Sequence, residues 1–161
     1  MILHENEYDH LIYKYATHDN LSFAWTKAQI RQESNFNPLA ENKSSHAKGL
    51  MQFMDKTWLE WEDETPGIQN KFKDYDPFNP EDSIRVGCTY MKWLLGRFRG
   101  DINLALASYN WGIGNIMKLR GKLSYFDIEK KLPKETQDYV KRITGYTKIY
   151  QQQFEKEYLN K

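Results

Sequence analysis

The segment 79–100 carries a helical repeat of apolar residues, and this repeat limits the folds open to the chain. Its apolar side chains recur at spacings of three or four: Ile84, Cys88, Met91, Leu95 and Phe98. Asn79 can cap the start, Pro80 suits a first helical turn, and the two acids that follow lie against the positive end of the helix dipole. Gly100 interrupts the pattern. The segment is therefore predicted to be a long helix in the core.

Helical spacing also dominates much of the remaining chain. It predicts further helices in five places: a peripheral one around Ile2, Leu3, Leu11, Ile12 and Tyr15, one from Leu21 to about Glu33, one over 55–63, one over Ile102–Tyr109, and a last long one from near Pro133. Asp101 can cap the fourth of these, and Gly112 and Gly114 are expected to end it.

No segment shows the alternation of polar and apolar residues that is typical of a strand. The Pro- and Gly-containing stretch 65–80 is predicted to be a long loop that includes short turns. We expect a mainly α fold in which residues 1–161 form a single domain, with many short helices packed around the central, alanine-rich helix at 102–109.

Composition narrows the functional classes. With 40% hydrophobic and 15% aromatic residues, the 161-residue chain is too rich in core-forming side chains to be disordered. Its 23 basic and 22 acidic residues nearly balance, so there is no large positive field and no nucleic acid partner is expected. Cys88, the single cysteine, cannot form an internal disulfide and lies on an apolar helix face, where packing is its expected role.

The first residues, MILHENEYDHLIYKY, carry acidic and histidine side chains where a signal peptide needs a basic start and an apolar run. No later run approaches membrane-spanning length. We therefore expect no signal peptide and no integral membrane segment.

Glu33 is the candidate general acid. It falls in or near the last turn of the predicted 21–33 helix, because Asn37-Pro38 prevents any continuation. There the negative end of the helix dipole disfavours the charged carboxylate, and desolvation by Trp or Phe neighbours would add to the effect, so both raise the pKa of Glu33. Protonating a glycosidic oxygen requires a carboxylic acid of this kind.

Four motifs follow one another in the chain: Glu-Ser-Asn-Phe-Asn-Pro-Leu-Ala at 33–40, Gly-Leu-Met-Gln at 49–52, Ala-Ser-Tyr-Asn-Trp-Gly at 107–112, and Leu-Pro-Lys-Glu-Thr-Gln-Asp-Tyr-Val at 132–140. Together they resemble the soluble lytic transglycosylase (SLT) family, which has a lysozyme-like fold. The resemblance covers roughly residues 20–145 with all four motifs in order. It departs from the family's usual pattern at His46, Ser83 and Trp111, and in a loop from Ala40 to Gly49 that is one residue longer.

The resemblance implies that Glu33 is the sole catalytic acid and base. It also implies a set of substrate-binding residues: Ser34, Met51, Gln52, Phe53, Tyr109, Asn110 and Tyr139. The amides of Gln52 and Asn110 suit acetamido groups, and tyrosine combines a stacking face with a hydroxyl. For Met51, Phe53 and Tyr139, simple packing in the core remains an equal alternative.

Most glycosidases use two carboxylates, but no second acid is evident near Glu33. Glu41 lies in a polar, irregular segment and Asp55 is expected to start a helix. The resemblance therefore implies a lytic transglycosylase that cleaves the MurNAc-GlcNAc β-1,4 bond of peptidoglycan and leaves 1,6-anhydro-MurNAc. Two alternatives stay open: a goose-type-like muramidase, with Glu41 or Asp55 positioning water, and a wall-binding or virion structural module without catalysis.

No cofactor and no metal are expected, because the four histidines form no helical ligand pair: His4, His10, His18 and His46. The expected partner is the glycan strand of peptidoglycan, bound by a monomer. A small wall-cutting chain made in the cytoplasm would suit a bacteriophage endolysin or a virion-associated protein, and would act on the wall after phage-type release.

Overall fold

Helices form most of the structure, a computed structural model that describes residues 4–119, 121 and 124–159. In chain order they are α1 (Asp9–His18), α2 (Phe23–Ser34), α3 (Asp55–Glu64), α4 (Ile68–Lys71), α5 (Pro80–Arg97), α6 (Ile102–Trp111), α7 (Ile113–Met117), α8 (Tyr125–Ile128), a 3-10 turn (Glu129–Lys131), α9 (Lys134–Phe154) and a π-helical turn (Glu155–Leu159). The only β pairing among the described residues is two isolated bridges, Glu41–Lys48 and Lys48–Phe53. The predicted mainly α fold is confirmed.

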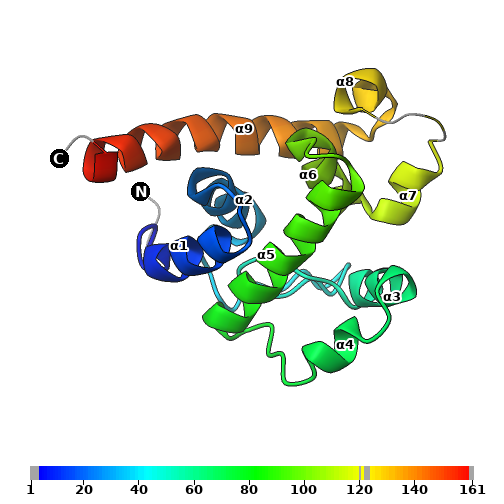
Figure 1. The fold of residues 1–161 in the computed structure, drawn as a ribbon, viewed down its shortest axis with the longest axis horizontal. Coiled ribbons are helices and arrows are strands. Elements are labelled where there is room, and N and C mark those ends of the chain that lie inside the picture. The colour runs from blue at the N-terminus through cyan, green and yellow to red at the C-terminus, as the bar shows by residue number, and fades with distance from the viewer. Residues whose placement is uncertain (1–3, 120, 122–123, 160–161) are drawn as a thin grey trace.

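Two helices, α5 and α6, run through the middle of the molecule (Figure 1). Helix α6 is almost wholly buried from Leu104 to Tyr109, and Ala105 and Ala107 allow α5 and α9 to approach it closely. The long α9 lies against both α6 and α2. A central alanine-rich helix, as predicted, therefore brings the ends of α2, α6 and α9 together.

The predicted starts of α5 and α6 are confirmed. Both depend on a capping side chain that is close in sequence to the backbone group it caps. The side chain of Asn79 accepts a hydrogen bond from Asp82 N at 3.0 Å, with Pro80 in the first turn of α5. Asp101 caps α6 in the same way, through Leu104 N at 3.0 Å. Each cap satisfies a backbone donor that the first helical turn leaves unpaired.

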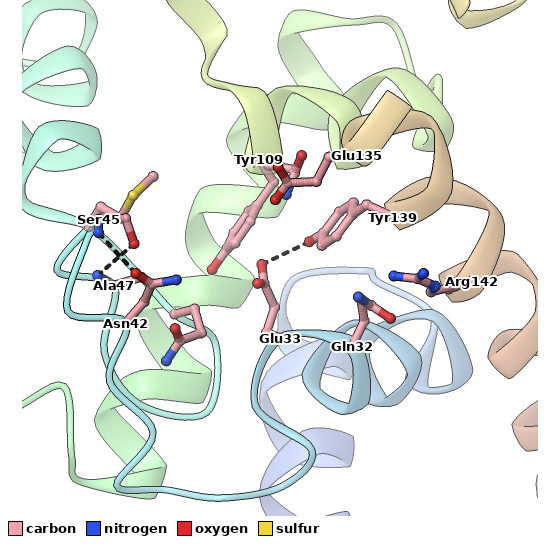
Figure 2. Close-up of a pocket in the computed structure, with 12 residues that line it drawn as sticks. Gln32, Glu33, Asn42, Ser45, Ala47, Tyr109, Glu135, Tyr139 and Arg142 are labelled. Atoms are coloured by element: carbon pink, nitrogen blue, oxygen red, sulfur yellow. Dashed lines mark hydrogen bonds between the residues drawn. The ribbon is translucent and has the colours of Figure 1, made fainter. Parts of the chain in front are cut away.

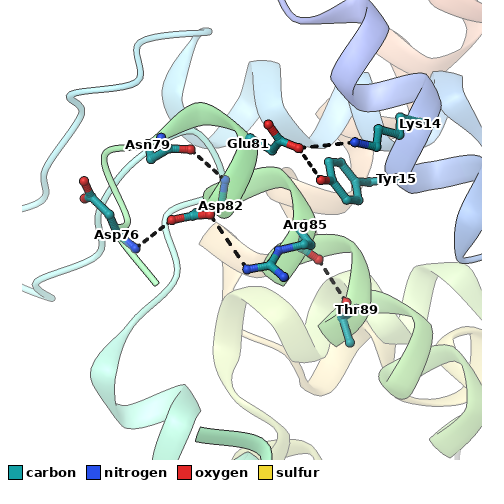
Figure 3. Close-up of polar contacts among 8 residues, drawn as sticks. All are labelled: Lys14, Tyr15, Asp76, Asn79, Glu81, Asp82, Arg85 and Thr89. Carbon is teal, nitrogen blue, oxygen red and sulfur yellow. Dashed lines mark hydrogen bonds and ion pairs between the residues drawn. The ribbon is translucent and has the colours of Figure 1, made fainter. Parts of the chain in front are cut away.

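The N-terminal helix α1 is part of the domain, although the apolar Ile2 and Leu3 of the predicted segment lie outside the described residues. Ile12 is fully buried against the core, and Tyr15 donates a hydrogen bond to the carboxylate of Glu81 at the start of α5. Lys14 pairs with the same carboxylate at 3.3 Å (Figure 3). These contacts fix α1 to α5.

The segment 65–80 was predicted to be a long loop that includes short turns, and the structure places the four-residue helix α4 within it. The short α4 forms there because Ile68 and Phe72 pack into the core, and because the Glu62 carboxylate accepts hydrogen bonds from the backbone N–H groups of Gly67 and Gln69. Gly112 ends α6, as predicted. Gly114 was expected to help end the same helix, but it lies inside α7. Within the described residues, none of the helices is both long and apolar enough to span a membrane.

Candidate active site

A pocket of about 320 Å³ opens where α2, α6, α9 and the loop between α2 and α3 meet (Figure 2). Its lining residues are Gln32, Glu33, Asn42, Ser45, Ala47, Gln52, Met54, Tyr109, Asn110, Glu135, Tyr139 and Arg142. Five of the residues singled out from the sequence are thus brought together: Glu33, Gln52, Tyr109, Asn110 and Tyr139.

Glu33 lies in the last turn of α2, as predicted. The helix starts at Ser22, whose hydroxyl accepts from Trp25 N, and ends at Asn35, which adopts the left-handed conformation with φ of 51°. Asn35 N still donates to the Arg31 carbonyl, which closes the final turn. This abrupt end turns the chain away and leaves the Glu33 carboxyl facing the pocket.

Burial of the carboxyl raises the pKa of Glu33 from 4.5 to about 8. The groups around it include Tyr109 and Tyr139 rather than the expected Trp or Phe. Although the residue as a whole is partly exposed through the pocket, the protein surrounds its carboxyl closely enough for burial to be the dominant cause. A Glu33 with this pKa holds its proton near neutral pH.

Tyr139 opposes this effect, because its hydroxyl donates a 2.9 Å hydrogen bond to Glu33 Oε2 and so lowers the pKa of the carboxyl. Burial and the neighbouring Glu33 raise the pKa of Tyr139 well above its usual range, so the phenol stays protonated and remains a donor. Tyr139 therefore stabilises the carboxylate form of Glu33 by a hydrogen bond and keeps its own phenolic proton.

Gln29, one turn before Glu33 on α2, was not anticipated from the sequence. Its side chain is only 2% exposed, and Nε2 donates to the Tyr139 hydroxyl oxygen at 3.4 Å. A hydroxyl has a single proton, so a donor on its oxygen directs that proton toward Glu33. Gln29, Tyr139 and Glu33 thus form one hydrogen-bonded chain.

Tyr109 and Asn110 connect the pocket walls. The Tyr109 hydroxyl donates to the Met51 carbonyl at 2.7 Å and so holds the loop before α3 against α6. Asn110 Oδ1 accepts from the Thr136 hydroxyl at 2.9 Å, which fixes the first turn of α9. The amide nitrogen of Asn110 is left to face the pocket as a donor.

Gln52 contributes to the pocket in an unexpected way. It has a positive φ of 50°, and its Nε2 donates to the carbonyls of Ala40 and Gly49 at 3.1 and 3.0 Å. Both amide hydrogens close the loop, so the side chain offers a substrate its Oε1 acceptor rather than paired donors and acceptors.

Three of the expected substrate-binding residues do not line the pocket. The Ser34 hydroxyl is buried and donates to the Ile30 carbonyl at 3.1 Å. Met51 is fully buried, and Phe53 is 5% exposed, with its ring 4.8 Å from that of Trp58 and 5.3 Å from that of Tyr90. Burial fits the alternative of core packing for Met51 and Phe53, and a role of these three residues in glycan binding stays a prediction.

Seven lining residues were missed: Gln32, Asn42, Ser45, Ala47, Met54, Glu135 and Arg142. Glu135 matters most, because it brings a second acid into the pocket from a segment about 100 residues away from Glu33 in sequence. Glu135 and Arg142 lie four residues before and three after Tyr139, which is the helical spacing of a shared face. That spacing could have identified them.

Two residues at which the chain departs from the family pattern, His46 and Ser83, lie in the loop 40–53 or contact it. His46 has φ of 62°, the left-handed conformation that favours glycine. The Ser83 hydroxyl accepts from Met51 N at 3.2 Å and so holds the loop to α5. Gly49 has φ of 79°, and a Cβ there would lie 1.9 Å from the Pro77 carbonyl oxygen, so only glycine fits.

In residues 4–119, 121 and 124–159, no group of three or more His, Cys, Asp or Glu side chains is placed to hold a metal ion. Cys88 is buried in the core, and its burial raises the pKa of the thiol far above the usual range. The pocket itself offers the buried carboxyl of Glu33, two tyrosines, several amides and the exposed charged side chains of Glu135 and Arg142.

Comparison with known proteins agrees with this arrangement. The family model described as "Transglycosylase SLT domain" matches residues 10–131. A putative soluble lytic murein transglycosylase of Haemophilus influenzae is 32% identical over 138 residues, which are 82% of this chain and 23% of that protein. The 70-kDa soluble lytic transglycosylase of Escherichia coli has a similar structure, with a TM-score of 0.69 at 26% identity over 87% of this chain and 23% of that one.

An inactive mutant of the lytic transglycosylase Slt of Pseudomonas aeruginosa is also similar, with a TM-score of 0.73 at 28% identity. The match covers 95% of this chain and 25% of that one. The chain thus spans about a quarter of the length of these relatives. With a family match over most of its residues and the helical fold that accompanies it, the chain belongs to the transglycosylase SLT domain family.

Proposed function

We propose that the chain is a lytic transglycosylase that cleaves the MurNAc-GlcNAc β-1,4 bond of peptidoglycan and forms 1,6-anhydro-MurNAc. One observation carries this proposal: the Glu33 carboxyl, with a pKa of about 8, faces a polar pocket in a chain of the SLT family. The relatives named as murein transglycosylases support it, as does a P. aeruginosa relative whose inactivity accompanies the replacement of one glutamate by glutamine.

The reaction needs one proton to leave Glu33 and one to return. Protonated Glu33 donates to the leaving glycosidic oxygen while the bond from that oxygen to the anomeric carbon breaks. The substrate's 2-acetamido group helps to stabilise the cation. The 6-hydroxyl of the same sugar then bonds to the anomeric carbon, and the Glu33 carboxylate takes its proton. Between the two steps, the hydrogen bond from Tyr139 stabilises the carboxylate.

Hydrolysis is the second candidate, because Glu135 places another carboxylate in the same pocket. An inverting glycosidase uses such a carboxylate to activate water on the opposite face of the sugar. Glu135 is exposed, whereas the carboxyl of Glu33 is buried. An exposed carboxylate can act as a general base toward water. The products separate the two candidates, since hydrolysis adds a water that the anhydro product lacks.

The test is digestion of purified peptidoglycan followed by mass spectrometry of the soluble fragments, with Glu33→Gln as the inactive control. We expect anhydro-muramoyl ends from the wild type and none from the variant. Reducing muramoyl ends would support the muramidase alternative. If the wild type and Glu33→Gln both release nothing, the non-catalytic alternative holds and the proposed activity is wrong.

We also propose that the domain acts as a monomer and reaches the wall by phage-type release or as part of a virion. Light scattering of the purified chain tests the monomer, and fractionation of expressing and lysing cells tests the route.

A further inference from the structure

Helix α9 presents a charge gradient along the pocket. Glu135, Tyr139 and Arg142 lie at positions i, i+4 and i+7, so they share one face, with the two charges separated by about 10 Å along the helix axis. All three line the pocket, and Figure 2 shows Glu135 and Arg142 on opposite sides of Tyr139. A bound glycan therefore meets a negative group at one end and a positive group at the other.

Arg142 differs from three other arginines of the chain, whose guanidinium groups contact partners within the protein. Arg31 stacks on Tyr146 at 4.0 Å, Arg97 pairs with Glu64 at 2.7 Å, and Arg85 lies 3.8 Å from Asp82. Arg142 has no ion pair or hydrogen bond to any residue in the described part of the chain. A guanidinium is always charged, so this side chain offers unused donors to an anion in the pocket.

Gln32 adds an amide to the same end of the pocket. It immediately precedes Glu33 on α2, and it lines the same pocket as Arg142, with both side chains drawn on the same side of Glu33 in Figure 2. The side-chain amide of Gln32 also has no hydrogen-bond partner among the described residues. A planar guanidinium and an amide donor that line one pocket suit the two oxygens of a carboxylate.

We propose that Arg142 and Gln32 form a carboxylate-binding subsite for the anionic substituent of the muramoyl residue beside the cleaved bond. The inference rests on the proposed function, because muramic acid is the wall sugar that carries a lactyl group. That carboxylate belongs either to the lactyl group itself, where the peptide stem has been removed, or to the stem. Glu135 repels the same group at the opposite end, so the strand binds in one direction.

The subsite also separates peptidoglycan from uncharged glycans of acetamido sugars. Both types of strand offer acetamido groups to Asn110 and Gln52, but only peptidoglycan offers a carboxylate to Arg142. The expected preference for peptidoglycan over uncharged glycans therefore depends on the pair formed by Arg142 and the substrate carboxylate. Either charge can be removed, by replacing Arg142 or by converting the carboxylate to a neutral amide.

The experiment compares Arg142→Gln with Lys141→Gln, a matched loss of charge at the adjacent exposed residue, which faces a different pocket. The substrates are glycan strands with stems, strands stripped of stems by an amidase, and strands whose carboxylates have been converted to neutral amides. For each we measure kcat and KM, and also the binding of the strands to proteins that carry Glu33→Gln in addition.

We expect Arg142→Gln to raise KM about fivefold on carboxylate-bearing strands with little change in kcat, the size of effect typical of a charge-assisted hydrogen bond at a partly exposed site. Lys141→Gln and the neutralised strands should show no such effect. A loss confined to strands with stems assigns the carboxylate to the stem, and a loss confined to stripped strands assigns it to the lactyl group, which is a free carboxylate only there. A loss on both kinds of strand shows that the subsite accepts either carboxylate. Arg142→Lys should recover part of the affinity, because it keeps the charge without the planar fork.

The inference is overturned if Lys141→Gln causes the same loss, if the effect of Arg142→Gln persists on neutralised strands, or if there is no effect. A wild type that cleaves none of the strands would refute the proposed function instead. In that case binding alone decides, and equal affinity for charged and neutralised strands, or no binding of either, overturns the subsite.

Discussion

Replacing Glu33 by glutamine should stabilise the protein, and the gain should grow with pH. A pKa of about 8 instead of the ordinary 4.5 means that ionising this carboxyl in the folded state costs about 5 kcal/mol more than in the unfolded state, at 1.36 kcal/mol per pKa unit. Because the residue is partly exposed through the pocket, water screens part of this cost, and we expect about 2 to 4 kcal/mol.

The sign follows from proton linkage. Below the unfolded pKa of 4.5 the carboxyl is protonated in both states and the cost is absent. As pH rises from there toward about 8, the unfolded chain is ionised while the folded protein keeps its proton, so the wild type progressively loses stability relative to Glu33→Gln. Above about 8 the difference is complete.

Urea unfolding of both proteins, followed by tryptophan fluorescence from about pH 4 to about pH 9, measures this difference directly. Glu41→Gln is the control, since it removes an exposed carboxylate and should leave the free energy of unfolding almost unchanged throughout. A stability difference between the wild type and Glu33→Gln that is the same at every pH would refute the burial of the Glu33 carboxyl.

Three further outcomes are expected. Tyr139→Phe removes the donor that lowers the Glu33 pKa, so the fall of activity at high pH should move to higher pH and kcat should drop about tenfold; an unmoved pH profile would contradict this. Gly49→Ala should cost about 2 kcal/mol or more of unfolding free energy, because its Cβ meets the Pro77 carbonyl at positive φ, whereas Gly96→Ala in α5 should be neutral or stabilising by calorimetry. Glu135→Gln should leave anhydro ends as the product in mass spectra, and loss of all cleavage would favour hydrolysis.

The parts of the fold that depend on neighbours in sequence could be predicted. The starts of α5 and α6 follow from Asn79 and Asp101, whose side chains cap N–H groups three residues away. The position of Glu33 at a helix end follows from Asn37-Pro38. Helix α4 could not be predicted, because it depends on the packing of Ile68 against distant core residues rather than on local propensity.

The site was predicted less completely, for the same physical reason. Gln29 and Tyr139 are 110 positions apart, and nothing in the helical pattern indicates that the amide reaches that hydroxyl. The side chain of Gln52 closes its loop by a hydrogen bond to the Ala40 carbonyl, 12 residues earlier in the chain. The second acid, Glu135, enters the pocket from a segment far from Glu33 in sequence. Motifs identify which residue types meet at the pocket, but the hydrogen bonds that orient them come from tertiary packing.

The claim that Glu33 acts as both acid and base is tested most directly by digesting purified peptidoglycan in water enriched in heavy oxygen and measuring the mass of the new muramoyl ends. Intramolecular attack by the 6-hydroxyl predicts ends that are lighter than the hydrolysis product by one water and carry no heavy oxygen. Ends that contain heavy oxygen would contradict it, because the attacking group would then be water.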